Sequence, residues 1–130
     1  MRKVIFDANF LLLPLQFKID IFSEIEALIG HFEPMVLSTT LEELKKLSMR
    51  KSEKVRRHAL LALEIAKKCR IIETCAEPGE NYDDVLLRTA KECNCIVATN
   101  DRNLRRKLRE ARLATIFLRQ RTHLQIEGYV

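Results

Sequence analysis

The chain has 130 residues, the length of one ordinary domain. Hydrophobic residues make up 47% and charged residues 32%, with three Gly and three Pro, which excludes a disordered, collagen-like or low-complexity chain. Twenty-three Lys and Arg against eighteen Asp and Glu give a net charge of +5, which is compatible with a nucleic-acid partner but not specific for one. We expect a single domain over residues 1–130.

Membrane and export signals are weak in this sequence. The longest apolar stretch, Phe10 to Leu15, is far below the roughly 18 residues of a membrane span and contains Pro14. Asp7 and Asn9 interrupt the region where a signal peptide would be apolar, and no small-residue cleavage site follows. We therefore expect a cytoplasmic protein without a membrane contact.

Four cysteines, at positions 69, 75, 93 and 95, are open to several interpretations. The Cys93-Asn94-Cys95 spacing is too short for the usual zinc site, and no His lies nearby in the sequence. The spacing does not force disulfide pairing either. Small buried hydrophobic residues are the favoured interpretation.

Short apolar runs alternate with helical patterns along the chain. Arg2 to Phe6 predicts a strand buried on both faces, and the period of Ile19 to Ile29 predicts a helix that ends at Gly30. No clear helix start follows Asp7, and the tail from Thr122 to Val130 has no clear period. The remaining predicted strands are Pro34 to Leu37, Arg70 to Thr74, Cys95 to Thr99 and Thr115 to Leu118. One further predicted helix contains Leu41, Leu44 and Leu47, and two others run from Asp83 to Cys93 and from Arg102 to Arg112. The last runs from about Ser52 to Lys68, and its expected buried residues are Val55, Ala59, Leu60, Leu63 and Ala66.

This alternation is typical of an α/β domain. We predict three layers, α/β/α, around a mostly parallel sheet of about five strands. In such a sheet the ligand site lies beyond the carboxyl ends of the strands. Four acids fall there, and their mutual repulsion favours a hard divalent ion such as Mg²⁺ or Mn²⁺. These acids are Asp7, Glu43, Asp84 and Asp101.

Each acid also has a structural interpretation. Thr40 with Glu43, or Thr39 with Glu42, matches a capping box, and Asn81 with Asp84 matches a polar cap. Asp101 or Asn100 is suited to cap the helix from Arg102, whereas Asp7 is the least easily explained as a cap. The joint placement of four acids at one edge favours a functional site.

The motifs resemble those of PIN-domain ribonucleases from the first strand nearly to the last residue. The matching pieces are Val4 to Asn9, Glu43 to Leu47, Tyr82 to Leu87, and Ala98 to Asp101 followed by Leu104 and Arg105. The likeness is greater to the branch that processes ribosomal RNA, through Asp83-Asp84, the Thr99 to Asp101 triplet, Leu118 to Gln120 and Ile126 to Tyr129. Toxin endonucleases of toxin–antitoxin pairs come second.

The resemblance implies metal-assisted hydrolysis of RNA phosphodiesters by Asp7, Glu43, Asp84 and Asp101, with Asp83 as an additional ligand of Mg²⁺ or Mn²⁺. It implies a supporting role for Asn9, Thr99 and Asn100. Glu43 is preferred to Glu42, because one residue along a helix rotates a side chain by about 100°. The resemblance also implies homodimers and an antitoxin or pre-ribosomal partner.

Basic residues beside Asp101 are expected to hold RNA phosphates, namely Arg102, Arg105 and Arg106. Few aromatic residues fall outside apolar stripes, so the sequence predicts little base stacking. His31, His58 and His123 lie in segments that do not otherwise look like a site. A non-catalytic binding module and a response-regulator-like signalling domain are the competing hypotheses, and the latter lacks the Lys required at the end of the last strand.

Overall fold

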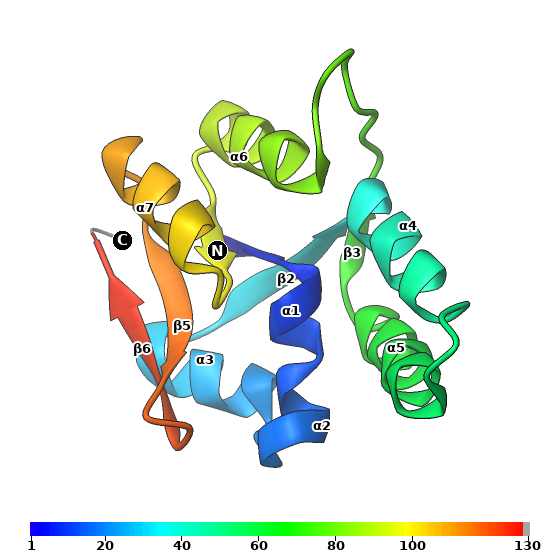
Figure 1. Cartoon of the computed structure of the whole chain (residues 1–130). Helices are drawn as coiled ribbons and strands as arrows, with labels where there is room; N and C mark the ends of the chain where they lie inside the picture. The colour runs from blue at the N-terminus through cyan, green and yellow to red at the C-terminus, as the bar shows by residue number, and fades with distance from the viewer. Residues whose placement is uncertain (129–130) are drawn as a thin grey trace.

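The computed structural model describes residues 1–128, which form one six-stranded sheet covered by helices (Figure 1). The strands follow each other in space in the order β3-β2-β1-β4-β5-β6. Their bounds are β1 (Arg2–Phe6), β2 (Phe32–Leu37), β3 (Arg70–Ile72), β4 (Ile96–Ala98), β5 (Thr115–Arg119) and β6 (His123–Glu127). The helices are α1 (Ala8–Leu11), α2 (Leu13–Phe17), α3 (Ile21–Ile29), α4 (Ser38–Leu47), α5 (Glu53–Ala66), α6 (Tyr82–Cys93) and α7 (Arg102–Glu110).

The sheet is parallel from β3 to β5, which confirms the predicted mostly parallel arrangement. The sixth strand, β6, pairs antiparallel with β5 and was not predicted. It is an edge strand in which Leu124 is buried and its neighbours are half-buried or exposed, so it lacks the apolar run of a central strand. The predicted motif piece from Ile126 to Tyr129 extends beyond the described residues at position 129.

Two cores lie on opposite faces of the sheet, which confirms the three layers. In β1 the side chains of Val4 and Phe6 enter one core, and that of Ile5 enters the other. All three are completely buried, as expected for a central parallel strand. The first core contains residues from α1 to α5, and the second contains residues from α6 and α7.

Helix α5 differs from its predicted packing. Ala59 and Ala66 are buried as expected, and Ala62 joins them, whereas Val55 and Leu60 are exposed. The three alanines recur at helical spacing and form the narrow buried stripe of the helix. Small side chains allow close approach to the core, and Leu63, which was predicted to be buried, is partly buried and packs against the same core together with Ile65.

Two short helices, α1 and α2, occupy the segment for which no helix start was predicted. The Asp7 side chain accepts a hydrogen bond from the backbone N–H of Ala8 and caps α1. Pro14 stands in the first turn of α2, where its missing N–H costs no helical hydrogen bond. Asp7 is therefore a helix cap, contrary to the sequence-based expectation.

The cysteines divide into two kinds. Cys69 and Cys95 are buried, as predicted, whereas Cys75 is exposed. A disulfide joins the exposed Cys93 to Cys95. Asn94 adopts a left-handed conformation with φ of 53°, which turns the chain sharply at the end of α6 and brings the two sulfurs together. Among residues 1–128, no helix is long and apolar enough to cross a membrane.

Candidate functional site

The candidate site lies where the direction of the chain reverses in the sheet. From β1 the chain moves outward to β2 and β3, and it then returns to place β4 on the other side of β1. The helices that follow these two central strands cover opposite faces, since α1 packs in one core and α7 in the other. Such a switch point is the usual ligand crevice of a parallel sheet. Asp7 directly follows β1, and Asp101 opens α7 after β4.

Asp7 is the buried member of the site, with 4% of its surface exposed. Its carboxylate accepts hydrogen bonds from the Thr99 hydroxyl at 2.7 Å, the Asn9 amide at 2.9 Å and the Ala8 N–H at 2.8 Å. Burial raises the pKa of Asp7 to about 6, and the nearby charges of Asp83 and Asp101 add to the increase. The Thr99 and Ala8 donors oppose part of this shift, and all three donors fix the orientation of the carboxylate.

Asn9, Thr99 and Asn100 form a frame around this carboxylate. The Asn9 side-chain oxygen accepts a hydrogen bond from the backbone N–H of Asn100 at 3.0 Å. The Thr99 hydroxyl also accepts one from the N–H of Asp101 at 3.1 Å. The Asn100 side chain accepts a hydrogen bond from the N–H of Leu118, which ties the frame to β5. Each residue expected to support the site therefore lies in this network.

Asp101 caps α7, as its structural interpretation predicted. One carboxylate oxygen accepts hydrogen bonds from the backbone N–H groups of Asn103 and Leu104 at 2.9 and 3.1 Å. Its charge also acts on Asp7 and Asp83, raising the pKa of both. Capping and membership of the acidic site are thus compatible in one residue.

Glu43 and Glu42 separate clearly on α4. Glu43 is half-buried, and burial together with the charges of Asp7 and Asp83 raises its pKa to about 7. Glu42 is exposed and lies 3.8 Å from the ammonium of Lys46. Neither capping box expected here is present, because α4 begins at Ser38 and its cap makes no side-chain hydrogen bond. The structure therefore removes the capping interpretation of Glu43.

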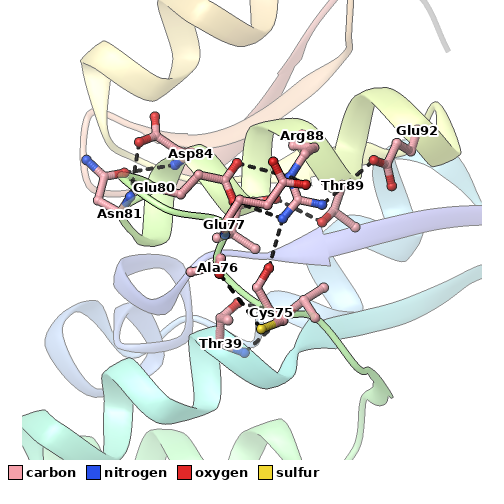
Figure 2. Close-up of polar contacts among 12 residues, drawn as sticks. Thr39, Cys75, Ala76, Glu77, Glu80, Asn81, Asp84, Arg88, Thr89 and Glu92 are labelled. Carbon is pink, nitrogen blue, oxygen red and sulfur yellow. Dashed lines mark hydrogen bonds and ion pairs between the residues drawn. The ribbon is translucent and has the colours of Figure 1, made fainter.

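Asp83 and Asp84 occupy different environments at the start of α6. Asp84 completes a capping box, accepting a hydrogen bond from the backbone N–H of Asn81 at 3.0 Å, while its own N–H donates to the Asn81 side chain at 2.9 Å (Figure 2). Burial and the charges of Asp101 and Asp84 raise the pKa of Asp83, and Asp83 in turn acts on Asp7 and Glu43. Asp83 is therefore the acid of α6 that interacts with Asp7, Glu43 and Asp101. The sequence analysis had preferred Asp84 for this position and named Asp83 as an additional ligand.

The positive charge of Lys107 acts on the acidic site, where it lowers the pKa of Asp83. Arg102 and Arg106 are exposed on α7. Arg105 differs from the expectation: its guanidinium lies 3.5 Å from the centre of the Phe117 ring and is partly desolvated, which lowers its pKa. Arg105 therefore packs against β5, and Lys107 is the basic residue that the sequence-based selection omitted.

The donor chemistry of the four acids suits a hard divalent ion. All four offer only oxygen atoms, and their mutual repulsion is relieved by a bound cation. Within residues 1–128, no three acidic, histidine or cysteine side chains form a ready-made metal cage. The acids therefore match the ion in chemistry and charge, and a closed coordination shell is not preformed.

A loop beside the acids, residues 73–81, is held at both ends. The Arg88 guanidinium donates hydrogen bonds to both carboxylate oxygens of Glu80 and, at 2.9 Å, to the carbonyl of Cys75 (Figure 2). Arg88 lowers the pKa of Glu80 to about 2. At the other end, the Ser38 hydroxyl accepts a hydrogen bond from the N–H of Thr74 at 2.9 Å. These contacts were not predicted, because no sequence pattern links the participating residues.

These features define a three-layer α/β domain with an acidic, oxygen-donor site at the carboxyl edge of its sheet. The sequence profile described as "PIN like domain" matches residues 4–121, and the chain belongs to this family. The family and fold predicted from the motifs are thereby confirmed.

Similar proteins come from both predicted branches. Ribonuclease VapC4 of Methanocaldococcus jannaschii is 36% identical over 135 residues that cover all of both chains. The rRNA-processing protein fcf1 of Schizosaccharomyces pombe is 34% identical over 110 residues, which are 82% of this chain and 53% of fcf1. The solved PIN domain endonuclease Utp24 has a TM-score of 0.79 and 29% identity, covering 98% of this chain and 92% of that one.

Proposed function

We propose that this protein is an endoribonuclease that hydrolyses RNA phosphodiester bonds with the aid of Mg²⁺ or Mn²⁺. The observation that carries the proposal is the electrostatic coupling of Asp7, Glu43, Asp83 and Asp101, which come from four separate segments. Groups with strongly perturbed pKa values that converge at a ligand crevice are typical of catalytic sites. One relative is named a ribonuclease and another a PIN domain endonuclease, and these names support the same activity.

The proposed roles follow from the environment of each residue. Asp7, Glu43, Asp83 and Asp101 would hold the ion, while Thr99, Asn9 and Asn100 keep the buried carboxylate in one orientation. A bound divalent ion supplies charge neutralisation for the phosphodiester and acidifies the attacking water. Asp84 stabilises α6 instead. The exposed Arg102 and Arg106, with Lys107, offer positive charge to the flanking phosphates.

The biological setting proposed first is ribosomal or other RNA processing. It is supported by the similarity to fcf1, of which this chain spans about half, and to Utp24 over nearly the whole chain. The second candidate is the toxin of a toxin–antitoxin pair. The full-length match to Ribonuclease VapC4 favours it and would make an antitoxin the expected protein partner. A cytoplasmic location and a homodimer remain part of the proposal.

Cleavage of a labelled single-stranded RNA with Mn²⁺, Mg²⁺ or EDTA tests the proposal. We expect metal-dependent cleavage, and a loss of at least about 100-fold in Glu43→Gln, equivalent to roughly 3 kcal/mol of transition-state stabilisation. Glu26→Gln is the control, since it removes an exposed charge on α3, outside the site, and should leave the rate unchanged. EDTA-resistant cleavage, or equal rates for the two variants, would contradict the proposal.

Isothermal titration calorimetry with Mn²⁺ separates a nuclease from a non-catalytic module. A nuclease binds Mn²⁺ through Glu43 and cuts RNA, and both properties weaken in Glu43→Gln. A non-catalytic module binds RNA at the same affinity with or without the ion and cuts none of the substrates.

A further inference from the structure

A hollow of about 510 Å³ lies beside the acidic site, between α4 and the segment that leads into α6. Its wall includes Lys46, three residues after Glu43, and Tyr82, the residue before Asp83. Glu43 on α4 and Asp83 on α6 interact electrostatically, so the elements that form the wall of the hollow also carry the acids. The volume is within the range of pockets that hold small organic ligands, and one nucleotide is a ligand of that size. The hollow is therefore placed to receive part of a substrate bound at the acids.

The walls of this hollow are fixed by hydrogen bonds. The hydroxyls of Thr39 and Thr74, both in the wall, lie 2.9 Å apart and connect α4 to the loop. On the other side, Arg88 holds Glu80 and the Cys75 carbonyl (Figure 2). A cavity shaped in advance binds a ligand with little loss of conformational entropy.

Tyr82 carries an unsatisfied polar group at this place. Its hydroxyl is buried and makes no hydrogen bond of good geometry with residues 1–128. Buried tyrosine hydroxyls normally have a partner, and one left without it is typical of a ligand site. The Lys46 ammonium lies 5.2 Å from the centre of the Tyr82 ring and within reach of the hydroxyl, and this polar contact with Tyr82 raises the pKa of Lys46. The Lys46 side chain is 67% exposed and lies 3.8 Å from the Glu42 carboxylate, which also lines the hollow.

We propose that the hollow binds one nucleotide of single-stranded RNA next to the scissile phosphate, with its base on the Tyr82 ring and Lys46 on a phosphate. This inference rests on the proposed ribonuclease function and specifies where the strand is gripped. A base can replace the Lys46 ammonium on the ring, since base stacking on an aromatic side chain is stronger than an exposed cation–π contact. The released ammonium then neutralises a phosphate.

The wall offers a base both a donor and an acceptor. The Asn81 amide nitrogen is a donor, because the Asn81 side-chain oxygen already accepts from the N–H of Asp84, and the Glu42 carboxylate is an acceptor. The sequence analysis predicted little base stacking, and stacking on Tyr82 is a proposal beyond that prediction.

RNA binding by Tyr82→Leu, Tyr82→Phe and Lys46→Gln tests the inference. We use oligonucleotides with 2-aminopurine at successive positions and a Glu43→Gln background that prevents cleavage. We expect the fluorescence of 2-aminopurine to be quenched at one position of the oligonucleotide. Both the protein with the native Tyr82 and the Tyr82→Phe variant should quench it, because both retain an aromatic ring. Tyr82→Leu should abolish the quenching and lower the affinity about 5- to 100-fold. Lys46→Gln should weaken binding several-fold. Lys45→Gln, an exposed neighbour outside the hollow, is the matched control.

Two further measurements keep the outcomes distinct. Thermal unfolding and Mn²⁺ binding of Tyr82→Leu, made with Glu43 intact, should match the wild type and so show that the fold and acids are unchanged. If the wild type cleaves RNA and Tyr82→Leu has the same RNA affinity and cleavage positions, this inference alone is overturned. Absence of both RNA binding and cleavage in the wild type would overturn the proposed function and this inference together.

Discussion

The Thr99 hydroxyl donates a 2.7 Å hydrogen bond to the Asp7 carboxylate, joining the ends of two adjacent strands across 92 residues of sequence. It favours the charged form of an acid that burial otherwise keeps protonated. We predict that Thr99→Val raises the pKa of Asp7 further and lowers Mn²⁺ affinity, since protons and metal compete for the same oxygens. Calorimetry over pH 6 to 8 checks this, with the greatest loss at pH 6.

The matched variant for this prediction is Thr99→Ser, which retains the hydroxyl. It should bind Mn²⁺ with nearly wild-type affinity. Equal affinities for the valine and wild-type proteins would show that the hydroxyl has no effect on the charge of Asp7.

Neighbouring acids on α6 should have opposite phenotypes. Asp83→Asn should reduce RNA cleavage at least about 100-fold with little loss of stability, because it removes a charge that repels three others. Asp84→Ala should retain cleavage but lose about 1 kcal/mol of stability, the usual cost of a helix cap. Cleavage rates and urea denaturation measure both. The reverse pattern would return Asp84 to the catalytic set.

Metal-free protein should become less stable as pH rises from 5 to 8. The pKa of Asp7 is raised from 3.8 to about 6, so the folded state binds more protons than the unfolded chain between these values. The Asp7 contribution, up to about 3 kcal/mol at 1.36 kcal/mol per pKa unit, is lost as pH rises from about 4 to 6. Glu43, with its pKa raised from 4.5 to about 7, extends the loss of stability to about pH 7. Glu80, with its pKa lowered to about 2, stabilises the fold above pH 4.5 and loses that effect only in acid, outside this range.

Urea denaturation in EDTA at several pH values measures this dependence. Asp7→Asn should reduce it, leaving the part that comes from Glu43, and should be more stable than the wild type at pH 8. Mn²⁺ should raise the melting temperature of the wild type at pH 8 more than that of the variant. A wild-type stability that rises from pH 5 to 8 would contradict the prediction.

Arg88 should control the mobility of the loop at residues 73–81. Arg88→Met removes the hydrogen bonds to Glu80 and to the Cys75 carbonyl, and we predict faster hydrogen exchange in the loop. A higher KM for RNA with a nearly unchanged kcat should accompany it, because the acids are not touched. Lys91→Met, an exposed change on the same helix, is the control and should alter neither measurement.

The sequence predicts the central sheet well because its strands are short apolar runs with both faces buried. Val4, Ile5 and Phe6 illustrate this, as all three are completely buried. The edge strand β6 was missed because it lacks such an apolar run. It pairs with β5 alone, and its buried and exposed residues alternate so weakly that the segment resembles a loop. The Cys93–Cys95 disulfide depends on the turn at Asn94, whose backbone conformation the sequence does not specify.

The structure separates the two glutamates of α4, with Glu43 half-buried and Glu42 exposed, because helical rotation separates adjacent side chains. The role of Glu43 as a metal ligand stays a prediction. The same rule distinguishes Asp83 from Asp84, and the Asn81 cap three residues before Asp84 is the signal that identifies the capping acid. The coupling of Lys107 to Asp83 depends on how α6 and α7 pack, which no local pattern reveals.

The order of the strands also determines when the site can form during synthesis. Asp7 leaves the ribosome 92 residues before its partner Thr99, and the N–H of Thr99 is held in turn by the Ile116 carbonyl of β5. A nascent chain that ends before this strand lacks the two hydrogen bonds that tie Thr99 and Asn100 to β5. An RNA-cutting activity of the proposed kind therefore depends on β5 as well as on the four acids.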